Sequence, residues 1–456
     1  MVLLAHRWEM IMDHNRPRFP DQDIVLVVRN PHRAGALGKL LSAIGEAGAL
    51  VGDLTTRSVS PYHSIREITV SVYDDDHLLQ VLAAIRANTE AEVIETCDLV
   101  FARHQGGKIH CGRKQDIKLL SDLRYIYTPG VARICRAIQR DPTKALELTG
   151  IGNSVGIFTN GTRVLGLGDI GPLPAMPVME GKAVIYDQFV GISAVPILID
   201  TKDPEEFIDT VVRVAPTFGG IHLEDIRMPD CFRIEDELIR RLNKPVMHDD
   251  QHGTATVLLA AVLTALRHTN RDGRRDFICA QIGLGAAGFG IAKLLIQAGF
   301  RVIGVDRNES ACARMQTFGG DIATLEDAMA SAEIIIATTG VVGLIKPNMI
   351  RKGQIILSLS NPIPEIFPEE ALDAGAAYAA DGKSVNNALA YPGLFRAALD
   401  GRRKAITPAM KIAAARAISS LAGSDELVPS PLNPQVHTAV IAAATDAFRR
   451  EDSKGK

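Results

Sequence analysis

The run Gly283-Leu-Gly-Ala-Ala-Gly288 is the feature that most constrains the fold of this chain. An apolar run at 277–282 precedes it and has the pattern of a strand, while an apolar helical stretch follows it and ends at Gly299. A second strand pattern at 301–305 ends in Asp306. This succession predicts a Rossmann-type βαβ unit that binds a dinucleotide: a strand, a G-x-G-x-x-G turn, a helix, a second strand and an acid. Asp306 is placed to hold a ribose 2′-hydroxyl.

The same glycine spacing occurs a second time, at Gly166, Gly168 and Gly171. Pro172 and Pro174 follow directly, and they predict that no helix continues from these glycines. A dinucleotide site needs that helix. We therefore interpret the second run as a loop whose glycines let the backbone approach a small ligand.

Two pairs of acidic residues each follow a short strand-like run. Glu224-Asp225 follows Gly-Gly-Ile-His-Leu, and Asp249-Asp250 follows Pro-Val-Met-His. The carboxyl ends of parallel strands bind ligands in α/β sheets. Four carboxylates at one sheet edge repel each other unless a cation holds them, and oxygen ligands suit Mg²⁺ or Mn²⁺. Either pair alone could equally begin a helix, but two pairs after successive strands favour a metal.

Three further side chains between residues 180 and 254 could take part in chemistry. His248 and His252 have the i, i+4 spacing of a helical zinc site. However, the H-E-x-x-H motif is absent and Gly253-Thr254 predicts a turn, so we interpret both histidines as supporting or structural residues. Lys182 lies between a glycine and an apolar run. Burial would lower its pKa and allow it to act as a base.

Residues 21–104 predict the element order βαββαβ of a ferredoxin-like unit. The first strand-to-helix turn reads Asn30-Pro-His-Arg-Ala-Gly35. With this turn, the unit resembles an ACT domain, a module that senses small molecules. A ferredoxin-like dimerisation domain without a ligand is the alternative.

The composition limits the classes of protein to which the chain can belong. A net charge of −3 and a pI near 6.5 argue against a nucleic-acid-binding surface. The six cysteines are scattered without C-x-x-C, as is typical of free thiols in a reducing cytosol. The N-terminal apolar run is too short for a signal peptide, and the longest one, at 255–266, is too short to span a membrane. We expect a soluble, cytoplasmic protein of two or three domains.

Seven motifs occur in an order that resembles the malic enzyme family from about residue 105 to the C-terminus. They are YTPGV at 127–131, RVLGLGDIG at 163–171, EGK at 180–182, LED at 223–225, HDDQHGTA at 248–255, SNP at 360–362 and NN at 386–387. The resemblance implies an α/β substrate and metal domain at 105–252 and a Rossmann-type dinucleotide-binding domain with C-terminal helices at 253–456. One departure is His248-Asp-Asp-Gln-His252, where animal relatives show Asn-Asp-Asp-Ile-Gln.

The resemblance implies oxidative decarboxylation of malate with NAD(P) and a divalent metal. Lys182, supported by Asp249, would remove the 2-hydroxyl proton, and Tyr127 would protonate the enol carbon after decarboxylation. The implied metal ligands for Mn²⁺ or Mg²⁺ are Glu224, Asp225 and Asp250. The implied substrate-binding residues are Arg163, Asn361 and Asn386, and the implied cofactor-binding residues are Gly283, Gly285, Gly288, Asp306, Arg307 and Asn361.

Asp306 favours NAD because its carboxylate would repel a 2′-phosphate. Arg307 could instead pair with that phosphate, which leaves an NADP-preferring enzyme as an alternative. A malolactic enzyme, a 2-hydroxyacid or amino-acid dehydrogenase with an ACT domain, and a sensor with an inactive enzyme half are further alternatives. The expected partners are malate, further copies of the chain in a homo-oligomer, and a small effector at the ACT-like unit. No nucleic acid or membrane is expected.

Overall fold

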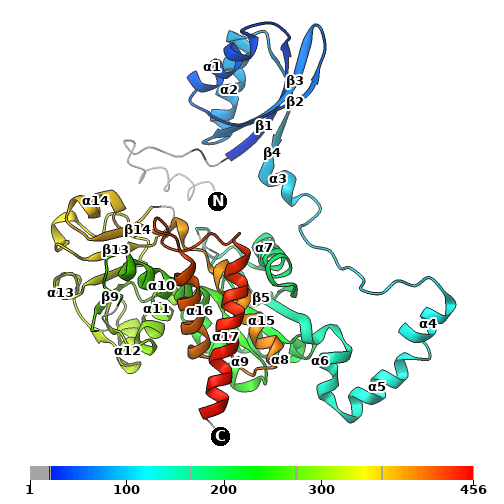
Figure 1. The fold of residues 1–456 in the computed structure, drawn as a ribbon, viewed down its shortest axis with the longest axis vertical. Coiled ribbons are helices and arrows are strands. Elements are labelled where there is room, and N and C mark those ends of the chain that lie inside the picture. The colour runs from blue at the N-terminus through cyan, green and yellow to red at the C-terminus, as the bar shows by residue number, and fades with distance from the viewer. Residues whose placement is uncertain (1–19, 21, 165, 273–275, 361–362, 455–456) are drawn as a thin grey trace. The chain divides into compact units, whose positions relative to one another are not determined.

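The structure, a computed structural model, describes residues 20, 22–164, 166–272, 276–360 and 363–454. The chain separates into two units, residues 1–110 and 111–456 (Figure 1). No helix in these described ranges is long and apolar enough to cross a membrane.

The first unit has the predicted element order βαββαβ. Its elements are β1 (Gln22–Pro31), α1 (Ala36–Glu46), β2 (Leu50–Val59), β3 (His63–Val72), α2 (Asp75–Asn88) and β4 (Glu92–Asp98), followed by α3 (Leu99–His104). The sheet order is β2-β3-β1-β4, and every pairing is antiparallel. Side chains such as Leu26, Leu40 and Ile68 form its core. All ten residues of the edge strand β2 are exposed.

The second unit begins with short helices that contain no buried residue. They are α4 (Leu120–Ile126), α5 (Val131–Arg140), η2 (Pro142–Lys144), α6 (Ala145–Leu148) and η3 (Gly150–Asn153). Large apolar side chains are exposed on this segment; Leu120 is 82% exposed and Tyr125 is 75% exposed. A surface of this kind usually marks an interaction site.

A parallel four-stranded sheet of order β6-β5-β7-β8 follows. Its strands are β5 (Ser154–Thr159), β6 (Ser193–Leu198), β7 (Gly220–Leu223) and β8 (Val246–His248), and its helices are α7 (Pro172–Val190), α8 (Pro204–Val214), η4 (Ala215–Thr217) and α9 (Asp230–Arg241). Because the strands are parallel, the acidic pairs that follow β7 and β8 lie at the same edge of the sheet.

The prediction that no helix could follow Gly171 is wrong. Helix α7 begins at Pro172, so that Pro172 and Pro174 occupy its first turn. The N–H groups of a first turn have no acceptor within the helix, and proline therefore loses nothing there. A third proline, Pro177, lies inside the helix.

The second sheet of this unit is the predicted Rossmann-type sheet. Its six parallel strands have the order β11-β10-β9-β12-β13-β14, which is that of a doubly wound dinucleotide-binding fold. The strands are β9 (Ile278–Ile282), β10 (Arg301–Val305), β11 (Asp321–Ile322), β12 (Ile334–Ala337), β13 (Ile355–Ser358) and β14 (Tyr378–Asp381). The helices are α11 (Ala286–Gln297), α12 (Glu309–Thr317), α13 (Leu325–Ser331), η5 (Pro347–Met349), α14 (Pro368–Asp373), η6 (Gly382–Ser384) and η7 (Asn387–Leu389).

Helix α10 (Asp249–His268) joins the two sheets, and fifteen of its twenty residues are buried. The prediction of a turn at Gly253-Thr254 is therefore wrong, because the helix already begins at Asp249. Helix α10 packs against α11 and α16 (Pro408–Leu421). The remaining helices of the unit are α15 (Tyr391–Asp400) and α17 (Pro434–Lys454).

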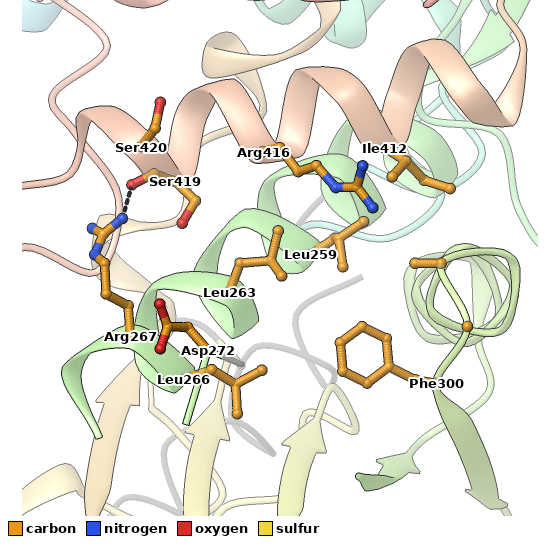
Figure 2. A pocket seen from close by; sticks show the side chains of 12 residues that line it. Leu259, Leu263, Leu266, Arg267, Asp272, Phe300, Ile412, Arg416, Ser419 and Ser420 are labelled. Carbon is orange, nitrogen blue, oxygen red and sulfur yellow. Dashed lines mark hydrogen bonds between the residues drawn. The ribbon is translucent and has the colours of Figure 1, made fainter. Parts of the chain in front are cut away.

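Two polar contacts and a cavity lie where the C-terminal half of α10 meets α16. Arg267 donates to the Ser419 carbonyl over 2.8 Å, and Thr264 and Ser419 share a hydrogen bond of 3.0 Å. A cavity of about 280 Å³ lies beside these contacts, and Figure 2 shows Leu259, Leu263 and other apolar side chains lining it. These contacts fix α10 against α16 at the end of the helix that lies away from its acidic first turn.

Candidate active site

The two acidic pairs meet at the edge of the smaller parallel sheet. Glu224 and Asp225 follow β7, while Asp249 and Asp250 are the first two residues of α10. Oxygen atoms of Glu224, Asp225 and Asp250 all lie within 4.8 Å of one another. The Asp225 N–H donates to Asp250 Oδ2 over 3.2 Å. These three carboxylates therefore have the spacing of ligands to a single cation.

Lys182 and His222 compensate the charge of Glu224, but not fully that of Asp225 and Asp250. Burial, followed by repulsion from Glu224, raises the pKa of Asp225 to about 7 and that of Asp250 to about 7. Asp225 Oδ2 is buried and has no hydrogen-bond partner among the described residues. A divalent cation fits this set of donors, because it would satisfy the orphaned oxygen and hold the carboxyls ionised.

Lys182 extends from α7 to the same edge. Its Nζ donates to Asp249 Oδ2 over 2.5 Å and lies 3.1 Å from Glu224 Oε1. Burial alone would lower the pKa of Lys182, as the sequence predicts. Asp249 and Glu224 outweigh burial, and the pKa is raised well above its usual value. The predicted direction is therefore wrong, because both anionic partners lie on other elements of the fold.

A cavity of about 760 Å³ joins the carboxylates to the Rossmann-type sheet. Asp225, Asp250 and Arg163 line it together with the glycine turn and the end of β10.

The glycine turn meets three different requirements. Gly283 has φ +89; a Cβ on Gly285 would meet nothing within 4 Å; and a Cβ on Gly288 would lie 1.9 Å from the Gly283 oxygen. The turn is thus tight, open to an approaching ligand at Gly285, and closely packed at Gly288.

Asp306 and Arg307 lie at the end of β10 and line the same cavity. Asp306 Oδ2 accepts the Leu284 N–H over 2.6 Å, and Oδ1 accepts the Asn308 N–H over 2.8 Å. The carboxylate therefore braces the glycine turn while it faces the cavity.

Comparison with known proteins agrees with this geometry. Residues 108–239 match the malic enzyme N-terminal domain, and residues 279–361 match the NAD binding domain of 6-phosphogluconate dehydrogenase. NAD-dependent malic enzyme 1 of Bacillus subtilis is 49% identical over 425 residues, which cover 92% of this chain and 97% of that protein. The chain belongs to the malic enzyme family.

Two further relatives support this family assignment. The NAD-dependent malic enzyme of Geobacillus stearothermophilus is 42% identical over 439 residues, which cover 90% of this chain and 91% of that protein. The crystal structure of malic enzyme from Pyrococcus horikoshii superposes with a TM-score of 0.71 at 39% identity, over 76% of this chain and 88% of that one.

Some of the residues that resemblance to malic enzymes implies lie elsewhere. Tyr127 follows α4 and is 69% exposed; it is not among the described residues that line the 760 Å³ cavity. Asn386 caps η7 by accepting the Ala388 N–H over 2.9 Å, and it lines a separate hollow. Asn361 lies outside the described residues.

The next asparagine, Asn387, contacts the carboxylate of Asp249. Its Nδ2 lies 3.3 Å from Asp249 Oδ2, and its Oδ1 accepts from the Thr254 hydroxyl over 3.1 Å. Sequence reasoning did not anticipate this contact of Asn387, because a double asparagine in a loop does not reveal which side chain turns toward Asp249.

Three buried aromatic residues of this site were also missed. Tyr186 Oη lies 2.9 Å from His222 Nδ1, and His222 Nε2 lies 2.6 Å from Glu224 Oε2. Lys182 Nζ lies 4.8 Å above the centre of the Tyr391 ring. Two of the three left a signal in the sequence. Tyr186 follows Lys182 by one helical turn, and His222 is a polar residue inside a fully buried strand.

His248 and His252 do not form a zinc site among the described residues, since neither belongs to a group of potential ligands that converge. His248 is fully buried at the N-cap of α10, and His252 lies within the first turns of that helix. His252 bonds to Glu235 and Lys411 instead of to a metal site.

We predict that any Mn²⁺ held by Asp225 and Asp250 is bound more weakly as the pH falls. The pKa of Asp225 and that of Asp250 lie above the usual aspartate value, at about 7. Below that pH, protons compete with the cation for both carboxylates. Each carboxyl should raise the dissociation constant about tenfold between pH 8 and pH 6. The electron paramagnetic resonance signal of free Mn²⁺ measures this, and equal affinity at the two pH values would contradict it.

Proposed function

We propose that this enzyme converts (S)-malate to pyruvate and CO₂ while reducing NAD, with Mn²⁺ or Mg²⁺ at the carboxylate cluster. Membership of the family makes the chain a malate oxidoreductase (decarboxylating). One observation carries the specific proposal. Asp225, Asp250 and the glycine turn line one cavity, and Lys182 pairs with Asp249 and with Glu224, the third carboxylate of the cluster.

Glu224, Asp225 and Asp250 would hold the metal. When bound, a divalent cation supplies a Lewis acid that stabilises negative charge on the substrate's 2-oxygen and on the enolate. NAD, when bound on the glycine turn, accepts a hydride. The role of the chain is to bring both reagents to one cavity, which Arg163 also lines and where it can pair with a substrate carboxylate through its planar guanidinium.

Lys182 and Asp249 act as a pair. Because Asp249 and Glu224 hold Lys182 protonated, the lysine must pass on its proton before it can accept the 2-hydroxyl proton. Asp249 Oδ2, 2.5 Å away, is the nearest acceptor, and Asn387 keeps that carboxylate in place. The hydroxyl proton thus moves to Lys182 as the lysine's own proton moves to Asp249.

We expect Lys182→Ala to abolish malate oxidation, because the acceptor of the hydroxyl proton is lost. A fall of about 10²–10⁴-fold is typical of a lost general base. The measurement is the absorbance of reduced cofactor with malate, with and without Mn²⁺. The same assay on the wild type should give a higher kcat/KM with NAD than with NADP, because the Asp306 carboxylate would repel a 2′-phosphate. Full turnover in the variant would remove the assigned base. Lactate without NADH as the product would identify a malolactic enzyme instead.

Tyr127 is the proposed acid that protonates the enol carbon. In this chain it is exposed, on a segment where Leu119, Leu120 and Tyr125 are exposed as well. A second copy that covers this surface in a homo-oligomer would bury these apolar side chains and could receive Tyr127 in its own active site. This arrangement reconciles the exposure of Tyr127 with its proposed role.

Co-expression of two inactive variants tests this arrangement. We expect Tyr127→Phe and Lys182→Ala each to be severely impaired alone. If Tyr127 serves the neighbouring copy, a dimer that contains one of each has one complete site, and an equal mixture recovers about a quarter of the wild-type activity. If Tyr127 serves its own chain, no complete site forms. Activity no higher than that of the separate variants would therefore refute delivery between copies.

The unit at 1–110 is the proposed regulatory ACT-like module. The 425-residue match to the Bacillus subtilis enzyme is longer than the unit at 111–456, so it extends into this module. Exposed β2, with Leu50 60% and Val59 57% exposed, offers an edge for pairing between modules. Gly35 has φ +81, and a Cβ there would meet nothing within 4 Å. A small carboxylate effector could therefore approach the start of α1.

A chain that begins at Lys108 tests this role. We expect it to keep malate oxidation but to lose the response to small effectors, because coupling requires the module; typical coupling is about 1–3 kcal/mol. Kinetics with a panel of amino acids and central metabolites, together with the molar mass in solution, provide the measurement. A truncated chain that is as oligomeric as the full chain and as responsive would show that the module is not the regulator.

A further inference from the structure

Glu235 is a buried acid that the proposed chemistry does not use. It lies on α9 and is 4% exposed. It shares the buried face of that helix with Cys231, Ile234 and Leu238. A carboxylate in an apolar position is costly unless hydrogen bonds satisfy it. The partners of Glu235 should therefore show what it does.

Among the described residues, the three hydrogen-bond donors to Glu235 all come from the start of α10. The backbone N–H of His248 donates to Oε1 over 2.7 Å. The Gln251 amide donates to Oε2 over 3.2 Å, and His252 Nε2 lies 3.0 Å from the same oxygen. Asp249 and Asp250 are the two residues between these contacts. One carboxylate thus holds the chain on both sides of the acidic pair.

A lysine on α16 extends the hydrogen-bond network of Glu235 through His252. Lys411 Nζ lies 2.9 Å from His252 Nδ1. An ammonium group can only donate, so Nδ1 accepts and the ring proton lies on Nε2, where it donates to Glu235. The neutral imidazole therefore links a buried cation to a buried anion. Burial would raise the pKa of Glu235, but His252 and His248 together outweigh it and lower that pKa to about 2, so the anion persists.

We infer that Glu235 is a positioning residue for metal binding: it fixes the first turn of α10 so that Asp250 meets Glu224 and Asp225, and Asp249 meets Lys182. This inference rests on the proposed metal site. Glu224 and Asp225 follow β7, whereas Asp250 belongs to α10. Their convergence within 4.8 Å therefore depends on how the start of α10 is held.

Glu235→Gln and Glu235→Asp test this role. The glutamine keeps the shape but loses the charge, and its amide nitrogen cannot accept from Gln251 or His252. The aspartate keeps the charge but is one methylene shorter. If Glu235 only balances Lys411, the aspartate should restore wild-type metal binding. If Glu235 positions α10, both variants should raise the Mn²⁺ dissociation constant about 10–100-fold, as lost outer-sphere partners do.

Glu237→Gln is the matched control. Glu237 lies two residues further along α9 and pairs with Arg240 and Arg241 near the surface. It should leave Mn²⁺ binding unchanged. NAD affinity, measured by calorimetry, should be unchanged in all the variants, because the hydrogen bonds of Glu235 among the described residues go to α10 and its N-cap and not to the glycine turn. A general loosening of the fold would instead weaken Mn²⁺ and NAD binding together.

The outcomes separate this inference from the proposed function. If the wild type binds Mn²⁺ no more tightly than Asp250→Asn does, the metal site itself is wrong, and the positioning role fails with it. If Asp250→Asn weakens binding but a folded Glu235→Gln binds as the wild type does, only the positioning role is overturned. Should Glu235→Gln fail to fold, Gln251→Ala removes one donor; unchanged Mn²⁺ affinity in that variant overturns the role.

Discussion

The contact between Lys182 and Asp249 is the interaction on which the site depends. It joins α7 to the first residue of α10 over 2.5 Å, and Glu224 at the end of β7 lies against the same lysine at 3.1 Å. Three elements thus converge on one cation. With Lys182 removed, buried Glu224 and Asp249 would lose the cation that they share, and unpaired buried charges are strongly unfavourable in a protein interior. The same ammonium group thus stabilises the resting site and takes part in the proposed proton transfer.

Features specified by neighbouring residues could be predicted from the sequence. The Rossmann-type unit follows from a strand, a glycine turn and a helix in direct succession, and the acidic pairs lie at strand ends because short apolar runs precede them. The errors arose where a local rule has an exception. We interpreted Pro172 and Pro174 as helix breakers, but the first turn of a helix tolerates proline. We predicted a turn at Gly253, but this residue lies in the interior of α10.

Contacts between distant segments could not be predicted in this way. The direction of the Lys182 pKa depends on Asp249, which is 67 residues away in the sequence. The contact of Asn387 with Asp249 depends on how one loop turns toward α10. Glu235 did leave a signal, an acid on the otherwise apolar stripe of α9. A charged residue in such a position suggests a buried partner, but only the fold shows that His248, Gln251 and His252 provide it.

Helix α10 also determines how the unit at 111–456 unfolds. It spans about 30 Å at the usual helical rise, and one hydrophobic cluster includes Val155 of β5, Leu258 of α10 and Ile336 of β12. Neither sheet can therefore lose its packing while the other keeps a complete core. Although the unit contains two separate sheets, denaturant should unfold them in one cooperative transition, and amide hydrogens in β5 and β12 should exchange with similar protection.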